Sequence, residues 1–232
     1  MKTLVITGAS KGIGLATAGQ FADAGYRVLN ISRTSAPDKR IENHAIDLSL
    51  DSAESDLKTL LEAELTAGEI CLVHNAGKLT NDTAGATDTD SFESVMRINV
   101  TAPHIINQLV LPKMQSGSSI IYLGSTLSEK AVPGTYSYVV SKHAVVGMMR
   151  ATCQDLAGRQ IHTACICPGF TDTEMLRTHV GDSDEVLAQI AATSTFGRLV
   201  TPKEIADAIW FAANHAVING AVIHANLGQV EH

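Results

Sequence analysis

The chain has 232 residues, of which 45% are hydrophobic and 18% are charged, a balance typical of a globular protein rather than a disordered one. Its net charge of −7 and aromatic content of 4% argue against a nucleic-acid partner, which needs a basic face or stacking rings. No apolar run reaches membrane-spanning length, and the first residues lack the long apolar core of a signal peptide. We therefore expect a cytoplasmic protein with no membrane partner.

Short apolar runs rich in β-branched residues alternate with helix-like segments along the whole chain. Most runs are apolar on successive residues, as in strands buried on both faces. Strand–helix alternation from end to end predicts an α/β protein of residues 1–232, a single-domain Rossmann fold with a doubly wound parallel sheet and helices on both faces. The expected strands are residues 3–7, 27–32, 43–47, 69–75, 118–124, 161–167 and 220–225.

The glycine-rich stretch "TGASKGIG", residues 7–14, follows the first expected strand and opens a helix at 12–24. Glycines at such a junction let the backbone approach a pyrophosphate, and the helix N-terminus offers unpaired N–H groups. A turn without a ligand is the alternative interpretation. The predicted dinucleotide contacts here are Gly8, Ser10, Lys11, Gly12, Ile13 and Gly14.

The second expected strand ends at Ser32-Arg33, where dinucleotide folds that select NAD place an acidic residue. A hydroxyl and two cations, Arg33 and Lys11 of the glycine loop, would attract the 2′-phosphate that a carboxylate would repel. The pattern predicts NADP(H), with NAD(H) as the alternative. Arg33 by itself is equally consistent with a solvated surface side chain.

Two later segments begin with residues that favour the start of a helix. Residues 51–66 open with Asp51 as the expected N-cap. Residues 201–215 open with Thr201 as N-cap and Glu204 three positions on, which is a capping box.

Four cysteines, at positions 71, 153, 165 and 167, show no C-x-x-C spacing, and the histidines are scattered. The residues therefore predict small core side chains and no metal site.

Further motifs occur in order at the expected strand ends. They are "HNAG" at 74–77, Asn99 in "RINV", Ser125 after the fifth strand, Tyr138-x-x-x-Lys142, and "CPGFTDTEM" at 167–175. Together with the glycine loop, this collinear set resembles the short-chain dehydrogenase/reductase family over nearly the whole chain. The resemblance implies a seven-stranded Rossmann fold and an oxidoreductase that interconverts carbonyls and alcohols. It also implies a homotetramer or homodimer packed through helices near 101–116 and 135–157.

The segment "GTYSYVVSKHA" holds the residues suited to proton transfer. Lys142 lies four residues after Tyr138, on the same helical face, whereas His143 points about 100° away and is expected in the core or an interface. A free tyrosine is too weak an acid to protonate an alkoxide readily, and a nearby ammonium favours its phenolate. Tyr138 is therefore the expected general acid/base. Tyr136 falls off that face and is expected to form part of the pocket wall.

The family resemblance implies roles for the remaining site residues. Ser125 would donate a hydrogen bond to the substrate oxygen, Lys142 would also hold the nicotinamide ribose, and Asn99 would hold a helix bend and a water leading to Lys142. Plainer interpretations are open for single residues: Ser125 as a turn residue, Asn99 as a helix cap and Tyr138 as a half-buried core residue. Further cofactor contacts are implied at Asp47 and Leu48 for the adenine, at Asn75, Ala76 and Gly77 for a ribose, and at Pro168, Gly169, Thr171 and Thr173 for the carboxamide.

Residues 172–197 mix apolar and acidic side chains, which predicts a mobile, partly helical lid over a moderately apolar pocket. Ser119 stands where carrier-protein reductases of the family often have an arginine, which argues mildly against a carrier-protein substrate. A ketone, an aldehyde, a sugar or a 3-oxoacyl ester of coenzyme A remain open. Two alternatives to an NADP(H)-dependent reductase are an NAD-dependent alcohol dehydrogenase and a dinucleotide-binding sensor without catalysis.

Overall fold

The computed structural model describes residues 2–229, so Met1 and residues 230–232 of the predicted domain lie outside the described part. A seven-stranded sheet in the order β3-β2-β1-β4-β5-β6-β7, with every neighbouring pair parallel, confirms the predicted Rossmann fold. The strands are β1 (Thr3–Thr7), β2 (Arg27–Ser32), β3 (Ile41–Ala45), β4 (Ile70–His74), β5 (Ser119–Leu123), β6 (His162–Pro168) and β7 (Ala221–Ala225).

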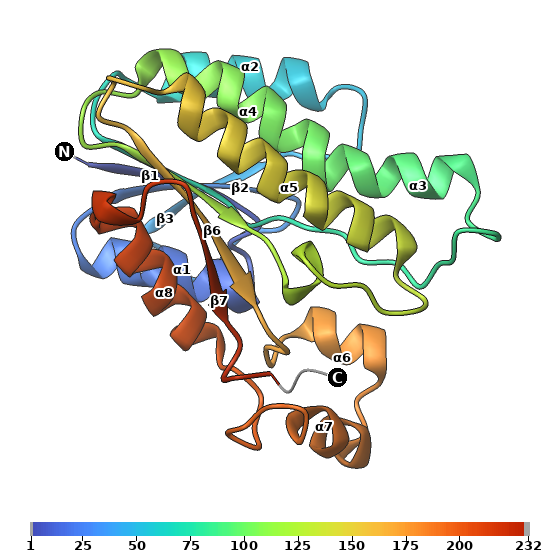
Figure 1. Cartoon of the computed structure of the whole chain (residues 1–232). Coiled ribbons are helices and arrows are strands. Elements are labelled where there is room, and N and C mark those ends of the chain that lie inside the picture. Colours follow the sequence, from blue (N-terminus) through green and yellow to red (C-terminus); the bar gives the residue numbers. More distant parts are fainter. Residues whose placement is uncertain (1, 230–232) are drawn as a thin grey trace.

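Helices cover both faces of the sheet (Figure 1). One face carries α1 (Gly12–Asp23) and α8 (Pro202–Asn214), which pack against each other. The other face carries α2 (Ala53–Glu64), α4 (Ala102–Val110) and α5 (Tyr136–Asp155), with α3 (Thr89–Met96) leading into α4. Two short helices, α6 (Glu174–Val180) and α7 (Asp184–Ala191), lie beyond the sheet and give the predicted lid its helical part.

Local sequence signals explain most element boundaries. The capping box at the start of α8 is confirmed, because the Thr201 side chain accepts from the Glu204 N–H and Glu204 reaches back to the Thr201 backbone. Two predictions were wrong. The third strand occupies residues 41–45 rather than 43–47, since Ile41 is its buried anchor. Asp51 does not cap α2: Ser52 precedes the helix, and Asp51 pairs with Arg97 at 2.7 Å.

The strand order reverses beside β1, whose two neighbours are β2 and β4. After β1 the chain enters α1 on one face, and after β4 it enters α3 and α4 on the other, which opens a crevice between the carboxyl ends of β1 and β4. Thr7, His74 and Leu123 end the three central strands at this edge, so the residues that follow them are brought together.

A chain of buried polar groups crosses the layer between the sheet and α4 and α5. His74 Nε2 lies 2.8 Å from Asn107 Oδ1, Asn107 Nδ2 donates to the Tyr122 hydroxyl, and that hydroxyl lies 3.2 Å from Thr152 Oγ1. His74 Nδ1 is buried without a partner among residues 2–229. Burial lowers the pKa of His74 from 6.5 to about 4, because an imidazolium is poorly solvated there.

This pKa predicts an acid-labile contribution to stability. The unfolded chain binds a proton at His74 below pH 6.5, whereas the folded chain resists it until about pH 4, so this contribution is lost as the pH falls through that window. By pH 5, the free energy of unfolding should drop by about 2 kcal/mol more in the wild type than in His74→Asn. Urea unfolding at pH 7 and pH 5 measures this, and equal losses in the two proteins would contradict it.

Candidate active site

A cleft of about 390 Å³ opens at the carboxyl ends of the central strands. It is large enough for a small-molecule ligand or cofactor. Every residue that the sequence predicted for catalysis or cofactor binding lines this cleft except Asn99. They are Gly8, Ser10, Lys11, Gly12, Ile13, Gly14, Ser32, Arg33, Asp47, Leu48, Asn75, Ala76, Gly77, Ser125, Tyr138, Lys142, Pro168, Gly169, Thr171 and Thr173.

The glycine loop is a backbone cradle that excludes side chains. A Cβ atom on Gly14 would lie 2.3 Å from the Gly8 carbonyl oxygen and 2.5 Å from Asn75 Nδ2. Gly8 and Gly12 have φ values of 73° and 57°, which favour glycine. The loop therefore brings bare backbone to the N-terminus of α1, where N–H groups and the helix dipole suit a pyrophosphate.

Residues that the sequence interpretation missed hold this cradle in place. The Thr7 hydroxyl accepts from the N–H groups of Asn75 and Ala76, and Asn75 Nδ2 donates to the carbonyls of Thr7 and Gly8. Asn30, fully buried in β2, accepts from the Ala9 N–H at 2.9 Å. Thr7 and Asn30 are polar residues in otherwise apolar strands, and this contrast in the sequence could have identified them as residues that hold the loop. The amide of Asn75 thus binds the loop as well as lining the cleft.

At the β2 end of the cleft, Ser10 Oγ lies 3.2 Å from Ser32 Oγ, and Arg33 is exposed beside them. Lys11 reaches across to the lid, where its ammonium pairs with Glu174 at 2.5 Å. Both partners are mostly exposed, so the pair contributes little to stability. Of the two cations predicted for a 2′-phosphate, one is therefore engaged with a carboxylate of the lid.

Asp47 behaves as a turn residue while also lining the cleft. Its Oδ1 accepts from both the N–H and the hydroxyl of Ser49. The hydrogen bonds from Ser49, with a smaller contribution from the nearby Arg33 charge, lower the pKa of this carboxyl. Asp47 therefore stabilises a turn through Ser49 and also lines the cleft.

Tyr138 and Lys142 form a pair on one face of α5. The Lys142 ammonium lies 5.4 Å from the centroid of the Tyr138 ring and donates to the Leu123 carbonyl at 2.7 Å. Lys142 is only 5% exposed, so its charge acts through a poorly screened medium. The ammonium has two further donor hydrogens, and it lies close to Gly77, where a Cβ would be 3.8 Å from Nζ.

Ser125 follows β5 and caps a short 3₁₀ turn, Thr126–Ser128. Its Oγ accepts from the Leu127 N–H at 3.1 Å, which orients the hydroxyl oxygen and leaves the hydroxyl proton to be donated. Gly124 must be glycine, because a Cβ there would lie 2.7 Å from Cys167 Sγ and 2.8 Å from Cys165 Sγ. Packing of β6 against this strand end therefore sets where Ser125 enters the cleft.

Asn99 lies behind the cleft, in a π-helical turn, Arg97–Thr101, between α3 and α4. Its Oδ1 accepts from the Lys78 N–H at 2.7 Å, and its Nδ2 donates to the Lys78 carbonyl and to Ser141 Oγ. These bonds tie the segment after β4 to α5, next to Lys142. The π-helical turn interrupts the regular helix at this position, and the predicted helix bend and water remain predictions.

The segment after β6 joins the cleft to the lid. Thr171 Oγ1 donates to the Gly169 carbonyl, and Thr173 caps α6 by accepting from the Leu176 N–H. A Cβ on Gly169 would lie 2.7 Å from Asn226 Cβ, so the segment after β7 packs directly against it. Lid movement remains a prediction.

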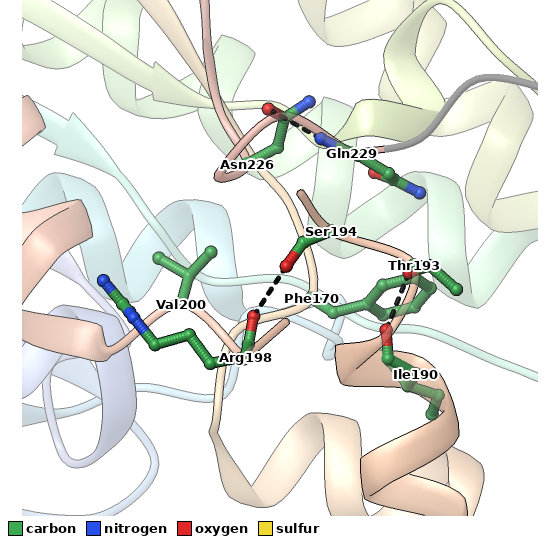
Figure 2. Close-up of a pocket in the computed structure, with 8 residues that line it drawn as sticks. All are labelled: Phe170, Ile190, Thr193, Ser194, Arg198, Val200, Asn226 and Gln229. Carbon is green, nitrogen blue, oxygen red and sulfur yellow. Dashed lines mark hydrogen bonds between the residues drawn. The ribbon is translucent and has the colours of Figure 1, made fainter. Parts of the chain in front are cut away.

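The lid side of the cleft is mainly apolar, with a few polar groups. A smaller cavity of about 10 Å³ lies between residues 190–200, Phe170 and the segment of Asn226 and Gln229, and Figure 2 shows the side chains that line it. Phe170 and Gln229 line both spaces. Burial lowers the pKa of His179, which lines the cleft from α6. From the predicted lid, Met175, Leu176 and His179 line the cleft, and the lining residues on this side that the sequence interpretation did not name include Leu79, Leu127, Val132, Phe170 and Gln229.

One minor prediction was wrong and another was wrong in part. Tyr136 is absent from the cleft lining: its side chain is 41% exposed and packs against Phe92, with ring centroids 6.0 Å apart. His143 is exposed, so its expected place in the core is wrong, whereas a place in a subunit interface stays a prediction; its Nδ1 lies 2.9 Å from the Val139 carbonyl.

Three of the cysteines are buried in the core, as predicted, and Cys153 is half-buried. Within residues 2–229, no group of three or more His, Cys, Asp or Glu side chains could hold a metal ion. No helix in the same range is long and apolar enough to cross a membrane.

Known proteins resemble this chain over nearly its whole length. A family model described as enoyl-(acyl carrier protein) reductase matches residues 8–229. With the glycine loop, Ser125, Tyr138 and Lys142 around one cleft, the match shows that the chain belongs to the short-chain dehydrogenase/reductase family of oxidoreductases.

Individual relatives cover nearly the whole chain. A 2-(R)-hydroxypropyl-CoM dehydrogenase of Xanthobacter autotrophicus is 32% identical, with 96% of each chain covered. A 3-oxoacyl-[acyl-carrier-protein] reductase of Aquifex aeolicus is 28% identical over 98% of this chain and 97% of its own. The solved structure of the angucycline C-6 ketoreductase LanV with bound NADP is 29% identical, with a TM-score of 0.84 over 98% of this chain and 95% of its own.

Proposed function

We propose that this protein is an NADP(H)-dependent oxidoreductase that reduces the carbonyl group of a ketone or an aldehyde to an alcohol. The observation that carries the proposal is the buried Lys142 ammonium, 5.4 Å from the Tyr138 ring, in a cleft that Ser125 also lines. The bound nicotinamide would supply the hydride. The relatives named as reductases and dehydrogenases support the same reaction class.

Two side chains would act on the carbonyl oxygen, and a third would act on the proton donor. Ser125 would donate its hydroxyl proton in a hydrogen bond to that oxygen, where negative charge develops as the carbonyl is reduced. Tyr138 would give its phenolic proton to the same oxygen, and in the reverse direction its phenolate would accept the proton from an alcohol. The Lys142 ammonium would stabilise the phenolate that remains, because an opposite charge in a poorly solvated site favours the ionised form.

The protein must also restore the proton on Tyr138 after each turnover. Lys142 has two donor hydrogens besides the one bound to Leu123, and these would hold a cofactor ribose hydroxyl that passes protons onward. Asn99 would hold the water that links Lys142 to solvent, from the widened turn at residues 97–101. The bonds from Asn99 to Lys78 and Ser141 would keep that turn beside α5.

The cofactor would lie along the cleft from Arg33 to Thr173. The glycine cradle would bind the pyrophosphate, and Pro168, Gly169, Thr171 and Thr173 would meet the carboxamide. Asp47 and Leu48 would flank the adenine, and Asn75, Ala76 and Gly77 would face a ribose. Ser32 and Arg33 would bind a 2′-phosphate, and the bound NADP of the ketoreductase LanV is consistent with this preference. NADH remains the alternative.

The lid side of the cleft favours a mostly apolar substrate with a polar group. Leu127, Val132 and Met175 would contact its carbon skeleton, while Gln229 has a buried Oε1 without a partner among the described residues. Ketones, aldehydes and 3-oxoacyl thioesters all present a carbonyl that fits this arrangement. We also propose a cytoplasmic homodimer or homotetramer, formed through α4 and α5, as the family resemblance implies.

The experiment is NADPH oxidation, followed at 340 nm, over a panel of ketones, aldehydes and 3-oxoacyl thioesters. For a carbonyl that the wild type reduces, Arg33→Ala should weaken NADPH about 10-fold and leave NADH nearly unchanged, since only NADPH has the 2′-phosphate. Arg40→Ala, which removes an exposed arginine paired with Asp23 and Asp38, is the matched control and should change neither cofactor.

Equal losses for NADPH and NADH in Arg33→Ala would remove Arg33 from phosphate recognition. Tight NADPH binding without oxidation by any carbonyl in the panel would instead favour the non-catalytic sensor.

A further inference from the structure

The first turn of α5, which carries Tyr138, has no cap within its own segment. Thr135 stands at the N-cap position, but its hydroxyl donates to the Val132 carbonyl at 3.1 Å rather than accepting from the helix. The first turn also has no acidic residue. The first N–H groups of a helix need acceptors from elsewhere, so this 20-residue helix depends on a partner outside it.

Asp82 is that partner, although it lies 55 positions before Ser137. Its Oδ1 accepts from the Ser137 N–H at 3.0 Å, and its backbone carbonyl accepts from the Tyr136 N–H at 3.2 Å. Its own N–H donates to the Gly134 carbonyl at 2.9 Å. One residue therefore bonds to both sides of the turn that opens α5.

The Asp82 carboxylate is itself fixed. The Thr80 hydroxyl donates to its Oδ2 at 3.0 Å, so both oxygens are bound. Partial burial raises the pKa of Asp82, but the hydrogen bonds from Ser137, Thr80 and Tyr136 outweigh it and leave the pKa below its ordinary value. The group is thus an anion near neutral pH, at the positive end of the helix dipole.

We propose that Asp82 is a positioning residue for Tyr138: by anchoring the first turn of α5, it fixes where the tyrosine hydroxyl meets the substrate carbonyl. The inference rests on the proposed function, because it takes Tyr138 as the proton donor. Tyr138 directly follows Ser137, whose N–H binds Asp82, and its hydroxyl lies at the far end of a long side chain. A small rotation of the turn therefore displaces the hydroxyl by a larger distance, and misplacement by about 1 Å can cost 100-fold in rate.

The test compares Asp82→Ala and Asp82→Asn in the full-length protein. In Asp82→Ala, kcat should fall about 10-fold or more, while the KM for the carbonyl and the Kd for NADPH stay within about twofold. Asp82→Asn keeps an oxygen acceptor for the Ser137 N–H and should recover much of kcat. Amide hydrogen exchange at residues 136–139 should be faster in Asp82→Ala.

Asp88→Ala is the matched control. Asp88 caps α3 by accepting from the Ser91 N–H at 2.8 Å, so its removal costs a comparable helix cap, about 1 kcal/mol, on a helix without Tyr138. It should leave kcat and exchange at 136–139 unchanged.

Three results would overturn the proposal. The first is an unchanged kcat in Asp82→Ala, and the second is a loss of kcat matched by an equal loss in Asp88→Ala. The third is unchanged amide exchange at residues 136–139 in Asp82→Ala, which can be measured even if no carbonyl substrate is turned over. A failure of the proposed function would appear differently, as absent turnover in the wild type itself.

Discussion

Tyr138→Phe is expected to lower kcat for carbonyl reduction about 1,000-fold while leaving the Kd for NADPH nearly unchanged. The substitution removes one hydroxyl and keeps the ring that packs in the cleft wall, so the shape of the site is preserved. Single-turnover measurements with NADPH and a carbonyl substrate that the wild type reduces, together with NADPH binding by fluorescence, separate the chemical step from binding.

The size of the effect follows from proton transfer. Reduction leaves an alkoxide, and a positioned general acid contributes about 10²–10⁴ in rate. In the proposed reaction the buried Lys142 ammonium, 5.4 Å from the Tyr138 ring, would stabilise the phenolate that the transfer leaves. Ser125 remains in the variant and should sustain a residual rate through its hydrogen bond to the carbonyl oxygen.

Tyr136→Phe is the matched control, since it removes the same hydroxyl from the same turn of α5. The Tyr136 ring is half-exposed against Phe92 and does not line the cleft, so the variant should keep the wild-type kcat. If Tyr138→Phe kept wild-type rates on a substrate that the parent reduces, another group would be the proton donor.

The sequence predicted the fold because each element carries its own local signal. The strands are apolar on successive residues, and α8 begins with a capping box formed by Thr201 and Glu204. Boundaries were less certain where burial decides them. In β3, Ile41 is buried whereas Glu42 and Ala45 are exposed, and this one-sided pattern hid the strand's true start from a search for apolar runs.

The cleft was predictable where spacing along one helix or one loop determines which residues meet. Tyr138 and Lys142 lie one helical turn apart, so helical geometry alone pairs them. Contacts between distant segments were not predictable in this way. The Lys11 pair with Glu174 and the Asp82 bond to Ser137 both depend on how loops fold over the sheet edge. Tyr136 was misplaced for the same reason, because the position of Phe92 on α3 determines where its ring packs.

Gly14→Ala is the second substitution expected to have a large effect. Its Cβ would lie 2.3 Å from the Gly8 carbonyl oxygen and 2.9 Å from Ala9 Cα. Because both are backbone atoms of the cradle, relief requires the loop and α1 to move apart, at a cost of about 2–3 kcal/mol. The N–H groups at the start of α1 would then no longer point at the pyrophosphate. We expect NADPH affinity to fall about 30–100-fold, with a lower melting temperature.

Gly19→Ala, on the same helix, is the control that isolates the steric cause. A Cβ there meets no atom within 4 Å, so the alanine should raise helix stability by about 0.5–1 kcal/mol. NADPH binding should be unchanged in this variant, as measured by fluorescence titration beside Gly14→Ala. Wild-type NADPH affinity in Gly14→Ala would mean that the cradle does not hold the cofactor. Opposite effects of the same substitution at positions 14 and 19 would show that close backbone approach is what makes glycine necessary in this loop.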